Sequence, residues 1–196
     1  MRMTKLAKDA VLELETRRRV YETIRDSPGL HFRELERRLM LGYGTLQYHT
    51  EFLIKHNLVS EEKGKEYSRF FAASFRSIKE RELLSLLRQK TNRHILIHLV
   101  DNPMSRNKDI AKNIELSPST ASWHLARLVE TGAVASENRG NETLYRVGDP
   151  EAVTKLLITY KSSFIDKIVD RFIDVWEKED RGVLKKPDAG KESGKT

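Results

Sequence analysis

The sequence contains no cysteine among its 196 residues. Disulfides, cysteine-based zinc sites, iron–sulfur clusters and thiol catalysis are therefore excluded. Long hydrophobic runs are also missing, because stretches such as Ile95-Leu96-Ile97 are far shorter than the roughly 20 residues that a transmembrane helix needs. The N-terminus, MRMTKLAKDAVLELE, alternates charged and apolar residues and lacks the continuous apolar segment of a signal peptide. These absences predict a cytoplasmic protein without a membrane span.

The motifs of common enzymes and metal sites are missing as well. No phosphate-binding loop and no nucleophile elbow occurs, and the carboxylates are scattered over predicted helix surfaces. His94 and His98 lie one helical turn apart, but His94 is not followed by the Glu that hydrolytic zinc motifs require. We therefore expect neither an enzyme nor a bound metal or cofactor.

Basic residues outnumber acidic ones. The 36 Lys and Arg residues against 29 Asp and Glu residues give a net charge of +7. Residues 1–75 and 76–150 carry an equal share of this excess, and residues 151–196 carry little. The balance favours an anionic partner such as nucleic acid.

An internal repeat organises the chain. The dipeptide Tyr48-His49 returns as Trp123-His124, 75 residues later. The same offset relates Asp26-Ser27-Pro28 to Asp101-Asn102-Pro103, and it also relates Leu35, Leu39, Leu41 and Thr45 to Ile110, Ile114, Leu116 and Thr120. One repeat of this length indicates two related modules rather than a solenoid.

Each copy has the hydrophobic periodicity of three helices followed by a hairpin. In the first copy, Pro28 and Gly29 end the first helix, the second spans His31 to about Leu39, and the third spans Tyr43 to about His56. Residues 58–71 then form two extended segments around a polar turn, and the second copy repeats this order. Three helices and a hairpin are typical of a winged helix-turn-helix. The predicted fold class is mainly α with small β-hairpins (α+β).

The repeat also predicts domain boundaries. We expect an N-terminal winged helix with a leading helix, a helical linker, a second winged helix, an amphipathic C-terminal helix and a disordered tail. Their predicted ranges are 1–75, 76–90, 91–148, 149–180 and 181–196.

The strings GTLQYHTEFLIKHNLV and STASWHLARLVETGAV carry a resemblance to a known family. They resemble the recognition-helix region of winged-helix transcription regulators of the ArsR and MarR type. The chain as a whole, over about residues 16–150, is similar to the tandem winged-helix regulators of archaea. The resemblance implies a sequence-specific regulator that reads the major groove of promoter DNA with two recognition helices per chain.

The two predicted recognition helices differ in quality. In the second, Ser117 is a plausible N-cap and Pro118 fits the first helical position. In the first, Gly42 or Tyr43 stands where a capping Ser is usual, and Thr50 replaces an inward-facing Leu. By the resemblance, the residues that read DNA are Tyr43, Thr45, Gln47, Tyr48, His49 and Glu51 in the first copy, and Ser117, Ser119, Thr120, Ser122, Trp123, His124 and Arg127 in the second.

Phosphate contacts are expected from exposed cations, with an affinity that falls as salt rises. The candidates are Arg17, Arg18, Arg19, Arg33, Arg37, Arg38, Lys63, Lys65, Arg106, Lys108, Lys112, Arg127 and Arg139. Structural roles remain open for several of these residues. Tyr48 and Trp123 fit half-buried structural aromatics, His49 and His124 fit hydrogen bonding within their modules, and the arginines fit ordinary solvated side chains.

After Asp149, a fitting N-cap, apolar residues recur every three or four positions to about Lys178. The pattern predicts one uninterrupted helix, whose apolar stripe must be covered. We expect it to form a homodimer interface, the alternative being packing on its own modules, against Lys5 to Glu15 or Ile78 to Leu87. The predicted interface residues are Leu157, Tyr160, Phe164, Ile168, Phe172 and Trp176.

Two other functions stay open at this stage. The modules could be protein-interaction elements of the transcription machinery that contact basal transcription factors and bind nucleic acid only non-specifically. RNA is a third possible partner. Sequence preference and the salt dependence of binding distinguish these alternatives.

Overall fold

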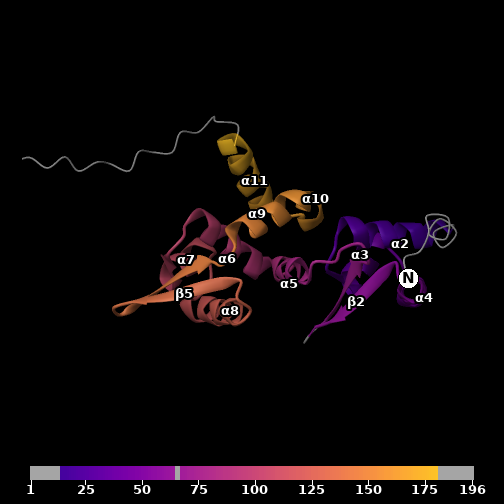
Figure 1. The fold of residues 1–196 in the computed structure, drawn as a ribbon, viewed down its shortest axis with the longest axis horizontal. Helices are drawn as coiled ribbons and strands as arrows, with labels where there is room; N and C mark the ends of the chain where they lie inside the picture. Colours follow the sequence, from indigo (N-terminus) through magenta and orange to yellow (C-terminus); the bar gives the residue numbers. More distant parts are fainter. Residues whose placement is uncertain (1–13, 65–66, 181–196) are drawn as a thin grey trace, which may run out of the picture.

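The computed structural model describes residues 14–64 and 67–180, with side chains described up to residue 177. Figure 1 shows two lobes joined by helix α5, with the C-terminal helices lying over the second lobe and α11 projecting from it. The lobes are the two copies of the sequence repeat. The fold is α+β, with two small antiparallel sheets among the helices, as predicted.

The first module has its helices and hairpin in the expected order, and a short extra strand follows its leading helix. Its elements are α2 (Glu15–Asp26), β1 (Leu30–His31), α3 (Phe32–Leu39), α4 (Tyr43–Lys55), β2 (Val59–Lys63) and β3 (Ser68–Ala72). The strands form one antiparallel sheet in the order β1-β3-β2.

The second module repeats this arrangement. Its elements are α6 (Lys90–Asp101), β4 (Ser105–Arg106), α7 (Asn107–Asn113), α8 (Pro118–Glu130), β5 (Val134–Arg139) and β6 (Glu142–Val147). The sheet order β4-β6-β5 matches that of the first module. The predicted hairpins are therefore present, and each gains a third strand that the sequence pattern did not reveal, because two residues are too few to show a period of two.

Several helix ends follow the sequence expectations. The Ser117 hydroxyl accepts a hydrogen bond of 3.1 Å from the backbone N–H of Thr120, and the Asp149 carboxylate accepts one of 2.9 Å from Ala152. Asn57 and Gly132 follow the two recognition helices with positive φ angles of 54° and 73°. Asparagine and glycine tolerate this left-handed conformation better than other residues, so both helices end where the sequence predicts.

Each module has its own hydrophobic core. In the first, Val20, Ile24, Leu35, Leu46 and Leu53 from the three helices pack together with Phe70 of the sheet. The second core is larger, because it also includes residues from α5 (Ile78–Leu87), α9 (Pro150–Thr159) and α11 (Lys167–Asp180). Helix α5 lies within the predicted linker, but Leu84 and Leu87 are fully buried in the second core. It is therefore a packed part of the second module.

The prediction of one uninterrupted C-terminal helix is wrong. The chain forms α9, the short α10 (Lys161–Phe164) and α11, and Ile165 between the last two has a φ of 48°. Because a left-handed residue cannot continue an α-helix, the chain changes direction there, and α11 packs against α6 and α9. The helical periodicity continued through this break and so could not reveal it.

Part of the predicted dimer interface is also wrong. Leu157, Phe164 and Phe172 are buried in the core of the second module. Their apolar surface is therefore covered by their own chain, which is the alternative that the sequence left open. Tyr160 and Trp176 are half-buried at the edge of this core, and Ile168 is 39% exposed.

Arginines join the two modules at one backbone oxygen. The Ser163 carbonyl accepts hydrogen bonds of 2.7 Å from Arg38 of the first module and 3.0 Å from Arg88 at the end of α5. Arg88 also donates to the carbonyl of Pro28 at 2.9 Å and lies over the Phe164 ring. Burial lowers the pKa of Arg88 to about 9, which still leaves the guanidinium charged at neutral pH. The relative position of the modules is thus fixed by charge-assisted hydrogen bonds.

A buried ion pair holds the C-terminal helices to the second module. Asp166 accepts hydrogen bonds of 2.9 Å from Arg93 Nε and from His94 Nε2. The Arg93 and Asp166 side chains are each 7% exposed. These hydrogen bonds lower the pKa of Asp166 against the opposing effect of burial, which is the largest single influence. Asp166 therefore remains ionised and anchors the start of α11 on α6.

Candidate nucleic-acid interface

Helix α8 presents a polar and aromatic face to solvent. Its apolar residues Ala121, Leu125 and Leu128 are buried. Ser119, Thr120, Ser122 and Trp123 are exposed on the opposite side. The Arg127 guanidinium lies 4.7 Å from the Trp123 ring centroid, a cation–π contact that limits the freedom of both side chains. A row of exposed small polar groups beside an aromatic and a cation can bind base edges and phosphates.

The helix-turn-helix angle of the second module is stabilised by Asn107 at the start of α7. Its side-chain amide donates to the Pro118 carbonyl at 3.1 Å and also to the Ser122 hydroxyl. Ser122 is therefore engaged by a neighbouring helix as well as facing solvent. No motif in the sequence pointed to Asn107 as a positioning residue.

Helix α4 presents the corresponding face in the first module. Leu46 and Leu53 are buried, whereas Tyr43 and Tyr48 are 61% and 57% exposed. Thr45 is exposed, and the Gln47 amide donates to the Glu51 carboxylate at 2.8 Å. That bond occupies the amide group that a glutamine would use in bidentate pairing to adenine.

The two recognition-helix histidines have internal positions. His49 is 7% exposed, and its Nδ1 has no hydrogen-bond partner among the described residues. The prediction that His49 contacts DNA is therefore wrong, because the ring faces the core beside α2. His124 is half-buried, and its Nδ1 lies 2.9 Å from the side-chain oxygen of Asn92. Since an amide oxygen accepts, His124 carries its proton on Nδ1.

Burial lowers the pKa of both histidines. Arg17 adds to the effect at His49, and Arg127 adds to it at His124. Both rings are therefore expected to be neutral at pH 7. Both are uncharged packing groups beneath the exposed faces of α4 and α8, and His124 also hydrogen-bonds to Asn92.

The predicted phosphate-binding cations separate into two groups. Arg33, Arg37, Lys63, Lys108 and Lys112 are exposed. For Arg17 and Arg38 the prediction of an exposed, phosphate-binding cation is corrected. Arg17 is 6% exposed, and its guanidinium lies 3.6 Å from the Phe52 ring centroid. Arg38 binds Glu34, Ser27 and Ser163. The structure uses both arginines to hold the module together. Lys65 lies outside the described residues.

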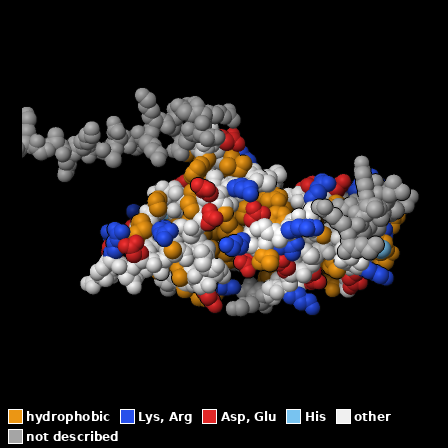
Figure 2. Space-filling view, viewed as in Figure 1, with side chains coloured by type: hydrophobic (Ala, Val, Ile, Leu, Met, Phe, Trp, Pro, Cys, Tyr) orange, Lys and Arg blue, Asp and Glu red, His pale blue; other side chains and the backbone are white. Residues whose placement is uncertain are grey.

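Two cations on the sheet of the second module are paired with carboxylates. Arg139 lies 2.7 Å from Glu137, and Arg106 lies 2.9 Å from Glu142. All four side chains are substantially exposed, so these pairs are weak and can exchange for phosphate. Figure 2 shows the same mixture over the visible face, where blue and red side chains alternate rather than forming one basic band.

The described residues contain no group of three or more His, Asp and Glu side chains placed to hold a metal ion. His94 binds Asp166, whereas His98 is buried in α6. In residues 14–64 and 67–180, no helix combines the length and apolar character required to cross a bilayer.

The fold defines the class of the protein. Two copies of a three-helix unit with a three-stranded sheet, each exposing one face of its third helix, constitute tandem winged helix-turn-helix domains. Residues 14–84 match a family model described as an N-terminal HTH domain, and residues 88–134 match one described as winged helix-turn-helix DNA-binding. The chain therefore contains tandem winged helix-turn-helix domains, the second of which matches a DNA-binding family.

Similarity to curated proteins agrees with this assignment. Over 148 residues, or 76% of the chain, the sequence is 32% identical to an uncharacterized HTH-type transcriptional regulator of Methanocaldococcus jannaschii. Over 71 residues, or 36% of the chain, it is 31% identical to an uncharacterized HTH-type transcriptional regulator of Bacillus subtilis. The chain spans 37% and 31% of the lengths of these relatives.

Proposed function

We propose that this protein is a sequence-specific transcription regulator that binds double-stranded DNA at promoters and reads the major groove with α4 and α8. One observation carries the proposal. Tyr48 and Trp123, related by the repeat, are 57% and 54% exposed on the outer faces of helices whose apolar residues are otherwise buried. Exposing a large aromatic side chain at the same place twice favours a binding surface over a packing role.

The two modules are proposed to contribute unequally. Helix α8 combines a capped N-terminus with Arg127 at its reading face, so it supports both base and phosphate contacts. Helix α4 carries Tyr43, Thr45, Gln47 and Tyr48 with Glu51 at its outer edge. It therefore contributes selectivity more than affinity, because base contacts specify and phosphate contacts attract.

We also propose that the protein is a homodimer and that it is located in the cytoplasm. Ile158, Ile165, Ile168 and Val175 are exposed apolar residues of the C-terminal helices and the turn between them. This surface, rather than the full apolar stripe, is the part that a second chain could cover. Sedimentation at micromolar concentration tests it: Ile165→Asp and Ile168→Asp should give a monomer if these residues form the interface.

The DNA proposal is tested by selecting bound genomic duplexes at about 150 mM salt. The wild type should enrich one motif near promoters. Tyr48→Ala should relax the preference in one half of that motif, and Trp123→Ala should relax it in the other half. Ile78→Ala is a matched control, since Ile78 is 71% exposed on α5, away from both reading faces.

The opposite results are equally informative. Binding without an enriched motif, unchanged in both aromatic variants, would reject base reading and favour a protein-interaction module. Loss of preference in only one half would show that a single module reads DNA.

A further inference from the structure

The Ser122 hydroxyl on the exposed face of α8 is held by a residue of another helix. Asn107 begins α7, and its side-chain nitrogen donates hydrogen bonds to the Ser122 oxygen and, at 3.1 Å, to the Pro118 carbonyl. A backbone carbonyl can only accept, so the nitrogen of the Asn107 amide must be the atom that faces α8. The Ser122 oxygen is therefore the acceptor in its bond with Asn107.

This arrangement leaves the hydroxyl hydrogen of Ser122 for a partner outside the protein. A serine hydroxyl has one hydrogen to donate and two lone pairs that accept. Among the described residues, the bond with Asn107 is the one hydrogen bond of the Ser122 side chain. Other serines donate back to their own helix, as Ser85 does to the Arg81 carbonyl at 2.8 Å. Ser122 makes no such bond to a described residue, and its side chain is exposed.

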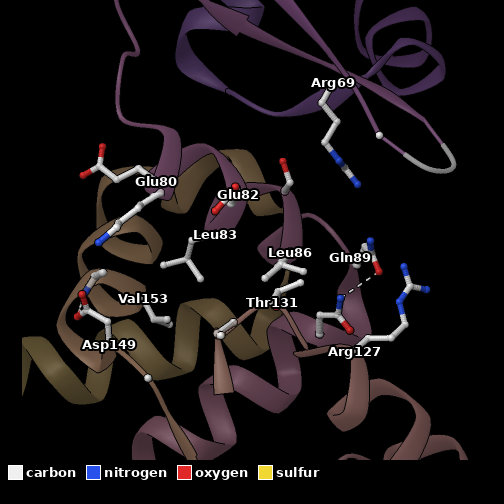
Figure 3. A pocket seen from close by; sticks show the side chains of 18 of the residues that line it. Arg69, Glu80, Glu82, Leu83, Leu86, Gln89, Arg127, Thr131, Asp149 and Val153 are labelled. Atoms are coloured by element: carbon white, nitrogen blue, oxygen red, sulfur yellow. Dashed lines mark hydrogen bonds between the residues drawn. The ribbon is translucent and has the colours of Figure 1, made fainter. Parts of the chain in front are cut away.

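The position of Ser122 along α8 keeps this hydrogen accessible. Figure 3 shows Arg127 and Thr131 at the wall of the cleft between the two modules. Both belong to the C-terminal end of α8, and among the described residues of this helix the cleft wall begins at Arg127. Ser122 lies more than one helical turn before that wall, beside the exposed Trp123. The first module therefore leaves this part of α8 uncovered.

Accepting from Asn107 makes the Ser122 hydroxyl a better donor than acceptor. One of its lone pairs is taken, and hydrogen bonds in a chain polarise one another, so the O–H group donates more strongly. When a partner covers the hydroxyl, a hydrogen without an acceptor costs more than a second lone pair without a donor. The surroundings of Ser122 therefore favour a partner that accepts.

The first module has a different arrangement at the same place. The 75-residue offset places Phe32 at the position of Asn107. It places Gln47 at the position of Ser122. The Phe32 ring packs against Tyr43, with 5.0 Å between the ring centroids, and it has no group that donates to α4. A hydroxyl held by an amide is thus a property of the second module, and the first module serves as an internal control.

We infer that Asn107 sets Ser122 as a hydrogen-bond donor, and that Ser122 selects a base with an acceptor on its major-groove edge. Guanine offers N7 and O6, adenine N7 and thymine O4, whereas cytosine offers only its amino donor. The preference at the base that Ser122 meets is guanine first and cytosine last. Ser122 is the specificity-determining residue, and Asn107 is a positioning residue that acts through it. The inference rests on the proposed function, because it concerns how α8 reads DNA.

The test measures base preference at single positions of the duplex that the genomic selection yields. Fluorescence anisotropy compares duplexes that differ at one base pair, and the ratio of two affinities for one protein cancels any change in overall affinity. At one position of the half-site read by α8, the wild type should bind guanine about fivefold more tightly than cytosine. Ser122→Ala should abolish this preference and leave the half-site read by α4 unchanged. Ser162→Ala, on the exposed surface of α10, is the matched control.

Asn107→Asp separates positioning from simple support of the fold. The carboxylate that it introduces can only accept, so the Ser122 hydroxyl turns its hydrogen inward and offers its oxygen to the base. The preference should therefore invert in favour of cytosine, whereas Asn107→Ala should remove it. A residue that only stabilised the module would weaken all duplexes alike and leave the preference unchanged. Thermal unfolding verifies that each variant is folded.

The outcomes separate this inference from the proposed function. A motif in which Ser122→Ala changes the preference at no position, or in which the sensitive position prefers cytosine, would overturn the inference alone. An unchanged preference in Asn107→Asp would also overturn it, since Ser122 would then read DNA without Asn107. Equal affinity of the wild type for all duplexes would reject the proposed function together with the inference.

Discussion

The two modules share one fold but differ in how their recognition helices are supported. Helix α8 begins with a Ser117 cap, buries Leu125 and places His124 against Asn92. Helix α4 begins at Gly42 without a side-chain cap. It buries Thr50, whose hydroxyl returns a hydrogen bond of 2.9 Å to the Leu46 carbonyl.

The environments of the two helix histidines show the same contrast. Arg17 occupies the repeat position of Asn92, so His49 lies near a cation where His124 has a hydrogen-bond acceptor. The second core is also extended by α5, α9 and α11. Two copies of one fold can therefore keep the same exposed helix face while they differ in local stability.

The largest effect is expected when the extra support of the second module is removed. Asp166→Ala leaves Arg93 and His94 without the carboxylate that they share, and breaking a buried ion pair costs about 3 kcal/mol of unfolding free energy. Denaturant unfolding measures the loss. Asp174→Ala is the control, because its pair with Lys161 is exposed and contributes less than about 1 kcal/mol. Equal costs would mean that Asp166 does not anchor α11.

The next effect concerns DNA affinity. Arg127→Gln should weaken binding by about tenfold and lower the magnitude of the salt slope by about one, as expected for the loss of one phosphate contact. Fluorescence anisotropy at several salt concentrations measures both quantities. Lys167→Gln removes an exposed cation from α11 and should change neither. If the two variants behave alike, the excess charge of the protein, rather than the α8 surface, controls affinity.

A smaller effect separates the two helix starts. Ser117→Ala should cost about 1 kcal/mol of stability, because it removes the hydrogen-bond acceptor for the Thr120 N–H. Gly42→Ser should add a few tenths of a kcal/mol, since Gly42 has a φ of −68° and a ψ of 154°, and a Cβ added there would meet no described atom within 4 Å. Thermal unfolding measures both variants, with Ser162→Ala on the surface of α10 as the control. A loss of stability in Gly42→Ser would show that the two helix starts are not equivalent.

The smallest effect is the response to pH. Burial lowers the pKa of His31, His49, His98 and His124 below the ordinary value, so protonating them opposes folding. The unfolding free energy should be constant with pH above about 7 as far as these groups are concerned, and should fall as the pH drops below about 6.5. NMR titration should also show the pKa of His49 rising in Arg17→Met while that of His124 stays unchanged. A fall in the His49 pKa would contradict the assigned effect of Arg17.

The sequence predicted most of the modular fold because its signals are local and repeated. The 75-residue offset, Pro28 and Gly29, and the caps Ser117 and Asp149 are all readable in a short window. The turn at Ile165 was not readable, because an isoleucine rarely adopts a positive φ and the apolar spacing continues on both sides. Packing of α11 against the second module selects that conformation.

The exposed faces of α4 and α8 were predicted better than the roles of the charged side chains. Tyr48 and Trp123 are exposed, as the helical period predicts, since the period alone separates inner from outer positions. Arg17, Arg38 and Arg88 were indistinguishable in sequence from solvated arginines. Arg38 and Arg88 donate hydrogen bonds to the Ser163 carbonyl, which lies 125 and 75 residues further along the chain, and Arg17 packs on the Phe52 ring. No local pattern predicts such contacts.

Arg38 and Arg88 both donate hydrogen bonds to the Ser163 carbonyl, so the two modules are held in one relative position. That position limits the spacing of the two half-sites in any operator that both modules share. If both modules bind one duplex, this rigid junction fixes the distance between their recognition helices along the DNA. DNA turns once in about 10 base pairs, so about five inserted base pairs would move the second half-site to the opposite face of the double helix. A protein held together at Ser163 could follow that change only by breaking the junction, and the spacing of its half-sites would be as much a part of its specificity as their bases.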